Sequence, residues 1–158
     1  MNLTTDVLII GGGLAGLTSA LHLQQAGVNV ILIEKNSYPH HKVCGEYISN
    51  EVLPYLNWLG LNISDLQPTS IAKLEFSTAS GKAINCDLPL GGFGISRFIL
   101  DEYLYKKALK NGCTVLKDTV ESVTFESNQF IVTTAKNRIL RSEIVIGAFG
   151  KRSNMDHH

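Results

Sequence analysis

The chain has no excess of either charge, few cysteines and no long apolar run. Its 158 residues include 14 lysines and arginines against 14 aspartates and glutamates, so the formal net charge is zero. A balanced charge disfavours nucleic acid or an anionic membrane surface as the main partner. No apolar stretch approaches the roughly 20 residues that cross a bilayer, and no basic segment precedes the first apolar run as in a signal peptide. These absences predict a cytoplasmic globular protein.

The three cysteines, Cys44, Cys86 and Cys113, are an odd number without close spacing. Such a set predicts neither a disulfide framework nor a zinc site, and it fits a reducing compartment. His40 and His41 are adjacent, and neighbouring side chains point in different directions on most backbones. We therefore expect no metal site in this chain.

The most informative segment is Asp6-Val-Leu-Ile-Ile-Gly-Gly-Gly-Leu-Ala-Gly16, which contains a G-x-G-x-x-G motif. The motif alone is weak evidence, but here its whole context is present. Residues 7–10 are typical of a buried strand, and leucines recur at helical spacing over 14–21. Residues 28–33 are typical of a second buried strand, which Glu34 ends. The pattern predicts a strand–helix–strand unit with an acid 18 residues after the last glycine.

Elementary chemistry gives each residue of this motif a role in binding a dinucleotide. Gly11 permits the tight turn from strand to helix, and Gly13 has no side chain to keep a pyrophosphate away from the backbone. Gly16 lets the helix pack closely on the strands. The helix then offers free N–H groups, at residues that include Leu14 and Ala15, together with the positive end of its dipole.

Glu34 lies where its carboxylate can accept hydrogen bonds from both ribose hydroxyls of a bound nucleotide. An acid there also repels a 2′-phosphate, so a dinucleotide without that phosphate is favoured. The alternative is a glycine-rich turn in an ordinary α/β protein, but strand, helix, second strand and acid all fall in register.

Beyond this unit the sequence predicts an α/β fold with a Rossmann-like parallel sheet. Ser96 caps a predicted helix over 97–110, and the parallel strands lie near residues 6, 29, 114 and 144. A β-meander and an inserted hairpin complete the fold. Their predicted ranges are 71–77 and 83–88 for the hairpin, 90–94 for a flexible connector, 120–125, 130–134 and 138–140 for the meander, and 143–148 for the last strand.

The order of these elements resembles the FAD-binding module of the glutathione-reductase type, in the branch of geranylgeranyl reductases and aromatic-ring hydroxylases. Four segments carry the resemblance, in family order and over nearly the whole chain. They are the glycine motif at 6–16, Lys42-Val-Cys-Gly-Glu46, Gly94-Ile-Ser-Arg-Phe-Ile-Leu-Asp-Glu-Tyr-Leu104 and Ile144-Val-Ile-Gly-Ala-Phe-Gly-Lys-Arg-Ser153. The resemblance implies FAD as the cofactor, with NAD(P)H as a candidate electron donor.

The resemblance also implies further cofactor contacts. Arg97 would reach the FAD pyrophosphate, although it could instead pair with Asp101 one helical turn later. Val120 would meet the adenine through its backbone, and Lys35 would bound the adenosine site unless it is only a solvated lysine. The remaining implied contacts are Lys42, Cys44 and Gly45 near the flavin, and Ala148 and Gly150 in the last segment.

Cys44 has a second interpretation, since Lys42 and two histidines lie near it in the sequence. Positive neighbours favour a thiolate, so a reactive cysteine beside the flavin is an alternative to a small residue that fits against the ring. No catalytic residue is identifiable from the sequence.

Two departures from the family pattern bear on function. Phe149 stands where the family usually has an aspartate near the nicotinamide route. The ribityl-binding Gly-Asp motif, the substrate sheet and the C-terminal helices of relatives do not follow. We therefore expect an N-terminal part, with an incomplete FAD-binding domain at 1–153, a hairpin insertion near 71–90 and a tail or tag remnant at 154–158. Such a part would be inactive alone.

The predicted function is that of an FAD-dependent oxidoreductase, similar to a geranylgeranyl reductase or to a flavin monooxygenase. The K-x-C-G segment favours the reductase side and an apolar small-molecule substrate. The alternatives are a non-catalytic nucleotide-binding module and an NAD-binding dehydrogenase domain. Exposed sheet edges would allow such a fragment to self-associate.

Overall fold

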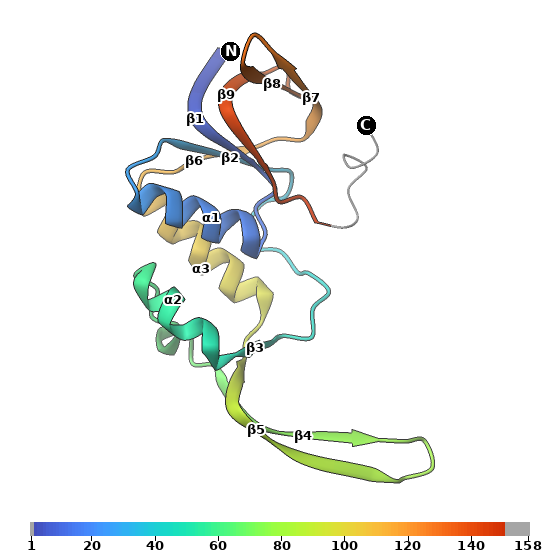
Figure 1. Cartoon of the computed structure of the whole chain (residues 1–158). Coiled ribbons are helices and arrows are strands. Elements are labelled where there is room, and N and C mark those ends of the chain that lie inside the picture. Colours follow the sequence, from blue (N-terminus) through green and yellow to red (C-terminus); the bar gives the residue numbers. More distant parts are fainter. Residues whose placement is uncertain (1, 151–158) are drawn as a thin grey trace. The chain divides into compact units, whose positions relative to one another are not determined.

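A computed structural model describes residues 2–150 of the chain, drawn in colour in Figure 1. The described residues form two compact units, one from residues 2–40 and 101–150 and the other from His41–Leu100. The expected ends of the domain at 151–153 and of the tail at 154–158 lie outside the described residues. Over residues 2–150, no helix has both the length and the apolar character needed to cross a membrane.

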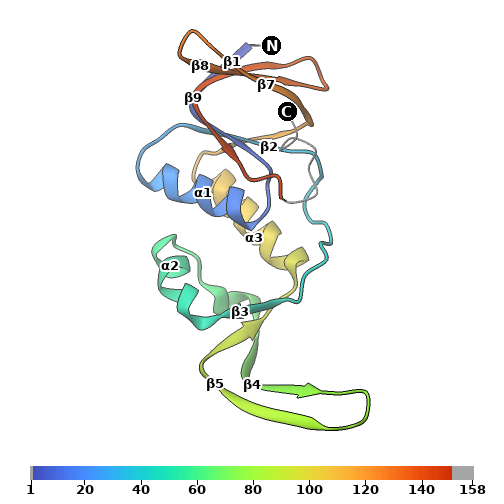
Figure 2. The ribbon, with the colours of Figure 1, turned by 45° about the vertical axis from the view of Figure 1, so that its right-hand side comes forward.

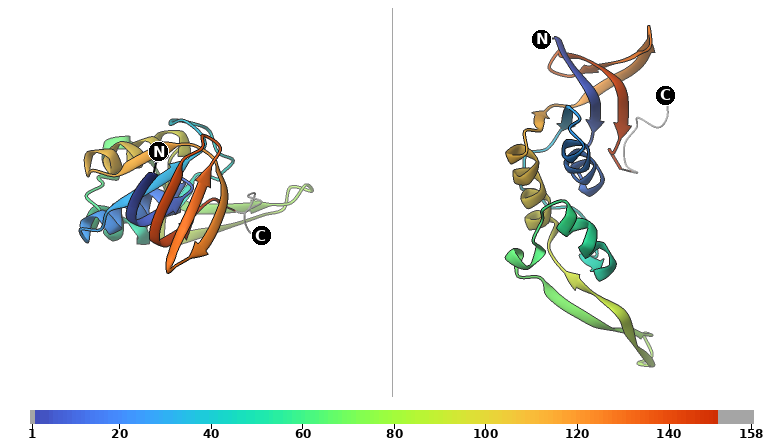
Figure 3. Two further views of the ribbon diagram at one scale, coloured as in Figure 1. Left: turned by 90° about the horizontal axis from the view of Figure 1, so that it is seen from above. Right: turned by 60° about the vertical axis from the view of Figure 1, so that its left-hand side comes forward.

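The first unit is built on a six-stranded sheet in the order β6-β2-β1-β9-β8-β7. Strands β6, β2, β1 and β9 are mutually parallel, as predicted, and β7 and β8 continue the sheet antiparallel. Figure 3 (left) shows β1 beside β9 in this twisted sheet. The strands are β1 (Asn2–Ile10), β2 (Val30–Glu34), β6 (Thr114–Lys117), β7 (Val120–Glu126), β8 (Gln129–Thr134) and β9 (Ile139–Gly147).

The central strands are covered on both faces, which explains why residues 7–10 and 30–34 are buried without alternation. Leu8 packs with Val132 and Leu140 of the meander. On the other face lie α1 (Leu14–Gln25) and the later turns of α3 (Arg97–Lys110), which are joined by a hydrogen bond from Gln24 Nε2 to Ala108 O. Figures 1 and 2 place α1 and the meander on opposite sides of β2.

The predicted division of residues 138–148 into two strands is wrong. Ile139–Gly147 is one continuous strand, β9, which pairs with β8 at its start and with β1 along its whole length. The polar run at 141–143 suggested a break. However, Ser142 is 1% exposed and lies on the buried side of the strand, so the run still alternates between inside and outside.

The second unit holds a three-stranded antiparallel sheet in the order β3-β5-β4, with one short α-helix and two 3₁₀ turns. The Ser49 hydroxyl accepts a hydrogen bond from the backbone of Glu51, and this cap begins the helical segment. The elements are β3 (Tyr47–Ser49), η1 (Asn50–Val52), α2 (Leu53–Trp58), η2 (Ile63–Leu66), β4 (Thr69–Ser77) and β5 (Ala83–Gly94).

The predicted flexible connector at 90–94 is wrong, because these residues form the end of β5. Gly92 pairs with Ile71 on one side and with Ser49 on the other. A Cβ atom built at Gly92 would lie 2.3 Å from the ring of Tyr47. Glycine at this position therefore allows the ring of Tyr47 to lie directly against the strand. In the sequence alone, the glycines of this segment suggested flexibility.

Candidate functional site

The glycine turn after β1 lies directly against the loop that follows β9. Gly11 has φ +105°, and a Cβ atom built on it would lie 2.4 Å from the carbonyl oxygen of Ala148. The N–H of Ala148 donates to Ile10 O at 2.8 Å, and the N–H of Gly11 donates to Ile33 O at 2.8 Å. Both backbone conformation and space therefore require glycine at position 11.

The N-terminus of α1 is open where a phosphate would approach. Gly13 is the N-cap, and no side chain caps the helix there. Leu14 is half-buried and Ala15 is exposed in the first turn. A Cβ atom at Gly16 would lie 1.9 Å from Gly11 O, so the helix packs on the turn as closely as a backbone can. The first N–H groups of a helix that lacks a side-chain cap are suited to bind an anion.

The carboxylate of Glu34 points at the glycine turn, and the residue as a whole is 7% exposed. Its Oε2 accepts the N–H of Gly12 at 2.7 Å, and its Oε1 accepts the backbone and side-chain N–H groups of Asn36 at 2.8 and 3.0 Å. A carboxylate has about four acceptor positions, so Oε2 keeps capacity for one further donor. The ribose contact remains a prediction, which this geometry leaves room for.

Two residues of this site, Gly12 and Tyr38, were missed by the sequence analysis. The hydroxyl of Tyr38 donates to Gly12 O at 2.5 Å, and its ring stacks on Tyr105 with centroids 4.3 Å apart. A Cβ atom at Gly12 would lie 1.8 Å from that hydroxyl. The available signal was the additional glycine between Gly11 and Gly13, at a position that the G-x-G-x-x-G pattern leaves open to any residue.

The other predicted nucleotide contacts of the first unit lie around this centre. Lys35 is exposed beside Glu34, and Val120 starts β7 at a bulge with its side chain against the core. Gly150, with φ +74°, is the last described residue. A pocket of about 220 Å³ in the same unit is lined by Glu34, Asn36, Ser37, Tyr38, Tyr105, Val115 and Lys117.

A buried ionic network supports this end of the sheet. Asp118 is 4% exposed and accepts hydrogen bonds from Thr134 Oγ1 at 2.7 Å, Thr119 N at 2.9 Å and Arg138 Nη1 at 2.6 Å. Burial by itself raises the pKa of Asp118, but the bonds from Thr134, Thr119 and Arg138 outweigh it, so the pKa lies below its ordinary value. The backbone N–H of Asp118 also donates to Glu34 O. The network therefore links β2 to the turn between β8 and β9.

The predicted flavin contacts Lys42, Cys44 and Gly45 belong to the second unit, as does Arg97, the predicted pyrophosphate contact. Two interactions within that unit bring the 42–46 segment beside the start of α3. Ile95 N–H donates to Glu46 O at 3.0 Å, and the rings of His41 and Phe98 lie 4.6 Å apart. Cys44 is an exposed free thiol whose sulfur accepts the N–H of Glu46, and a Cβ atom at Gly45 would meet nothing within 4 Å.

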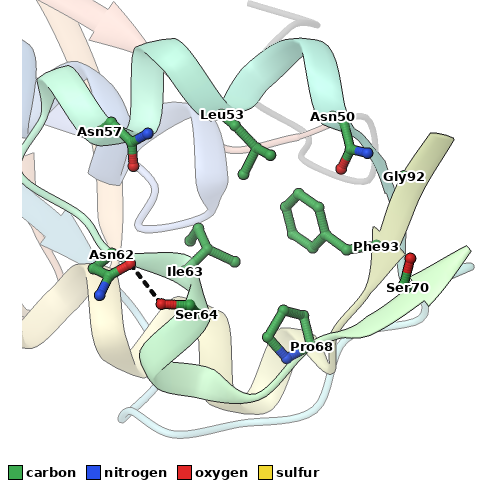
Figure 4. Close-up of a pocket in the computed structure, with 10 residues that line it drawn as sticks. All are labelled: Asn50, Leu53, Asn57, Asn62, Ile63, Ser64, Pro68, Ser70, Gly92 and Phe93. Atoms are coloured by element: carbon green, nitrogen blue, oxygen red, sulfur yellow. Dashed lines mark hydrogen bonds between the residues drawn. The ribbon is translucent and has the colours of Figure 1, made fainter. Parts of the chain in front are cut away.

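The second unit also has a pocket of about 330 Å³ between α2, η2 and the sheet (Figure 4). Leu53, Ile63, Pro68 and Phe93 form its apolar wall. Asparagine and serine side chains surround it, and the Ser64 hydroxyl donates to Asn62 Oδ1 at 2.8 Å. No residue of this pocket was predicted to bind the cofactor.

The residues of the first unit fit a bound FAD by their own geometry. The glycine turn leaves no space for side chains, an uncapped helix end follows it, and a buried carboxylate lies beside both. These are the features that a dinucleotide needs for its pyrophosphate and its ribose. In residues 2–150, no group of three or more His, Cys, Asp or Glu side chains could hold a metal ion.

The fold and this site define a dinucleotide-binding protein of the Rossmann-like class. Residues 4–158 match the family described as FAD binding domain, and the chain belongs to that family. FAD is thus the cofactor of this domain, as predicted.

Similar proteins include a reductase and a monooxygenase. The chain is 30% identical over 139 residues to a digeranylgeranylglycerophospholipid reductase of Methanosphaera stadtmanae, covering 83% of this chain and 33% of that protein. It is 30% identical over 161 residues to the FAD-dependent monooxygenase janM of Penicillium janthinellum, covering 94% and 33%. The chain spans about a third of the length of these relatives.

A solved structure has the same fold. It is a geranylgeranyl bacteriochlorophyll reductase-like protein from Thermoplasma acidophilum, with a TM-score of 0.84 and 24% identity, covering 99% of this chain and 42% of that one. The predicted Rossmann-like fold with its parallel sheet, meander and hairpin is confirmed.

Proposed function

We propose that this chain is the FAD-binding part of an FAD-dependent oxidoreductase. The observation that carries the proposal is the glycine turn before an uncapped helix, with Glu34 behind it, in a chain of the FAD-binding domain family. When bound, FAD supplies hydride or electron transfer, and the protein supplies binding, orientation and electrostatics.

In this proposal each predicted residue has a separate task. Backbone N–H groups at Gly13, Leu14 and Ala15 bind the pyrophosphate, and Gly11 and Gly16 shape the turn that presents them. The Glu34 carboxylate accepts a hydrogen bond from a ribose hydroxyl. Lys35, Val120, Ala148 and Gly150 bound the rest of the nucleotide. Arg97 reaches the pyrophosphate, and Lys42, Cys44 and Gly45 contact the flavin end.

We extend the proposal to the reaction, the electron donor, the location and self-association. Relatives named as reductases and monooxygenases support reduction of an apolar substrate or oxygen activation, with NAD(P)H as the electron donor. A cytoplasmic location agrees with the three free cysteines Cys44, Cys86 and Cys113. Self-association would use the exposed edges of the sheets, such as β4.

A non-catalytic nucleotide-binding module is the second candidate function, because no catalytic residue is identifiable in the sequence. An NAD-binding dehydrogenase domain is disfavoured, since the family match is to an FAD-binding domain. Turnover of an electron donor by a chain extended beyond residue 158 would separate the first candidate from the second.

The cofactor assignment is tested by an absorbance scan after incubation with FAD and desalting. We expect the unaltered chain to retain flavin bands and Gly13→Val to lose them, because a branched side chain at the N-cap blocks the approach of the pyrophosphate. Ala26→Val, at the exposed opposite end of α1, is the matched control and should retain flavin. Flavin bands that persist in Gly13→Val would contradict the phosphate-binding turn.

A further inference from the structure

The peptide groups around Gly12 are held from both sides. Its N–H donates to Glu34 Oε2 at 2.7 Å, and its carbonyl oxygen accepts the hydroxyl of Tyr38 at 2.5 Å. A Cβ atom at Gly12 would lie 1.8 Å from that hydroxyl and 2.9 Å from Glu34 Cβ. The middle glycine of the turn is thus enclosed between a carboxylate and a phenol.

Tyr38 is itself firmly placed. Its ring stacks on that of Tyr105, with centroids 4.3 Å apart and an interplanar angle of 13°. The ring centroids of Tyr38 and His40 lie 5.7 Å apart. Burial, and then the negative charges of Glu34 and Asp101, raise the pKa of the Tyr38 hydroxyl. The hydroxyl therefore keeps its proton at working pH and acts as a donor to the Gly12 carbonyl.

A trans peptide is planar, so its C=O and the next N–H point in opposite directions. The bond from Tyr38 fixes the carbonyl of Gly12 and, with it, the direction of the N–H of Gly13 at the N-cap of α1. We infer that Tyr38 is a positioning residue, which holds the glycine turn so that this N–H faces the pyrophosphate of the dinucleotide. The inference rests on the proposed FAD-binding function.

The test compares three ligands and two hydroxyl deletions in the full chain. Kd values for FAD, ADP and adenosine are measured by calorimetry on the unaltered protein, Tyr38→Phe and Tyr105→Phe. Loss of one hydrogen bond predicts about fivefold weaker FAD and ADP binding in Tyr38→Phe, with adenosine changed less than twofold. Tyr105→Phe keeps the stacked ring and should leave all three Kd values unchanged.

A double-mutant cycle with Gly12→Ala tests whether the effect passes through Gly12. The added methyl displaces the Tyr38 hydroxyl, so Tyr38→Phe should have little further effect on ADP binding in the Gly12→Ala background. The Gly13 amide resonance of the ligand-free protein should also shift in Tyr38→Phe and stay in place in Tyr105→Phe. Thermal unfolding of each variant separates a loss of folding from a loss of binding.

The outcomes are distinct. Equal ADP affinity in Tyr38→Phe and the unaltered chain overturns the inference, as does an equal loss for ADP and adenosine, or full additivity in the cycle. If the unaltered chain binds neither FAD nor ADP, the proposed function fails, and the positioning role fails with it.

Discussion

The central sheet of the first unit and the hairpin of the second unit use the same strand backbone in opposite environments. In β1, residues 7–10 are all buried between α1 on one face and the meander on the other. In the β4–β5 hairpin, Phe76 is 69% exposed and Ile84, which pairs with it, is 71% exposed. Apolar strands therefore mark burial in one unit and an uncovered surface in the other.

The difference shows which strands stabilise the chain by burial and which strands expose apolar surface. A strand covered on both faces contributes apolar burial at every residue, whereas an uncovered hairpin contributes mainly its own backbone ladder. The glycine turn that we assign to FAD is attached to the covered strands, and this attachment keeps its geometry rigid. Substitutions in the two regions should thus lower the free energy of unfolding by very different amounts.

The largest effect is expected at Leu8, which is fully buried in the core cluster of the first unit. Leu8→Ala removes buried apolar surface and leaves a cavity, which should lower the free energy of unfolding by about 2–5 kcal/mol. Denaturant unfolding followed by circular dichroism measures this. A loss below about 1 kcal/mol would show that the covered strand is not the stabilising centre that the comparison requires.

A smaller effect is expected at Asp118, whose network supports the sheet beside the site. Asp118→Asn removes the charge that pairs with Arg138 and should cost about 2 kcal/mol at pH 7. The folded-state pKa of Asp118 is lowered, so the stabilisation is fully present above its unfolded pKa of about 3.9 and is lost as pH falls through the folded-state pKa.

The pH dependence of stability, compared between the unaltered chain and Asp118→Asn, is the control for this prediction. As the pH falls below about 4, the unaltered chain should lose stability more steeply than Asp118→Asn, because the variant has no carboxylate at this position to protonate. Parallel pH profiles for the two proteins would mean that Asp118 contributes nothing through its ionised form.

The smallest effect is expected on the hairpin. Phe76→Ser removes an exposed aromatic ring and should change the free energy of unfolding by no more than about 0.5 kcal/mol. The same denaturant experiment, run beside Leu8→Ala, measures the contrast directly. A cost comparable to that of Leu8→Ala would mean that the hairpin surface is covered in solution, and concentration-dependent unfolding would then identify a second copy of the chain as the cover.

Local signals predicted most of the elements correctly. The helix over Arg97–Lys110 is predicted with Ser96 as its cap, and the Ser96 hydroxyl indeed accepts the N–H of Phe98. Leu100, Leu104 and Ala108 of this helix are all buried. The wrong boundaries fall where long-range pairing decides. Strand β9 continues through Ser142 because β1 and β8 hold it on both sides.

The sequence by itself determined the class of fold and the chemistry of the turn, because glycine spacing, strand length and a terminal acid are local properties of the chain. Tertiary structure alone decided that Gly12, and not only the glycines of the motif, is enclosed. It did so by bringing Tyr38, 26 residues away, to the carbonyl of Gly12. A contact between residues so far apart depends on how β1, β2 and the following loop pack, and no periodicity in the sequence records that packing.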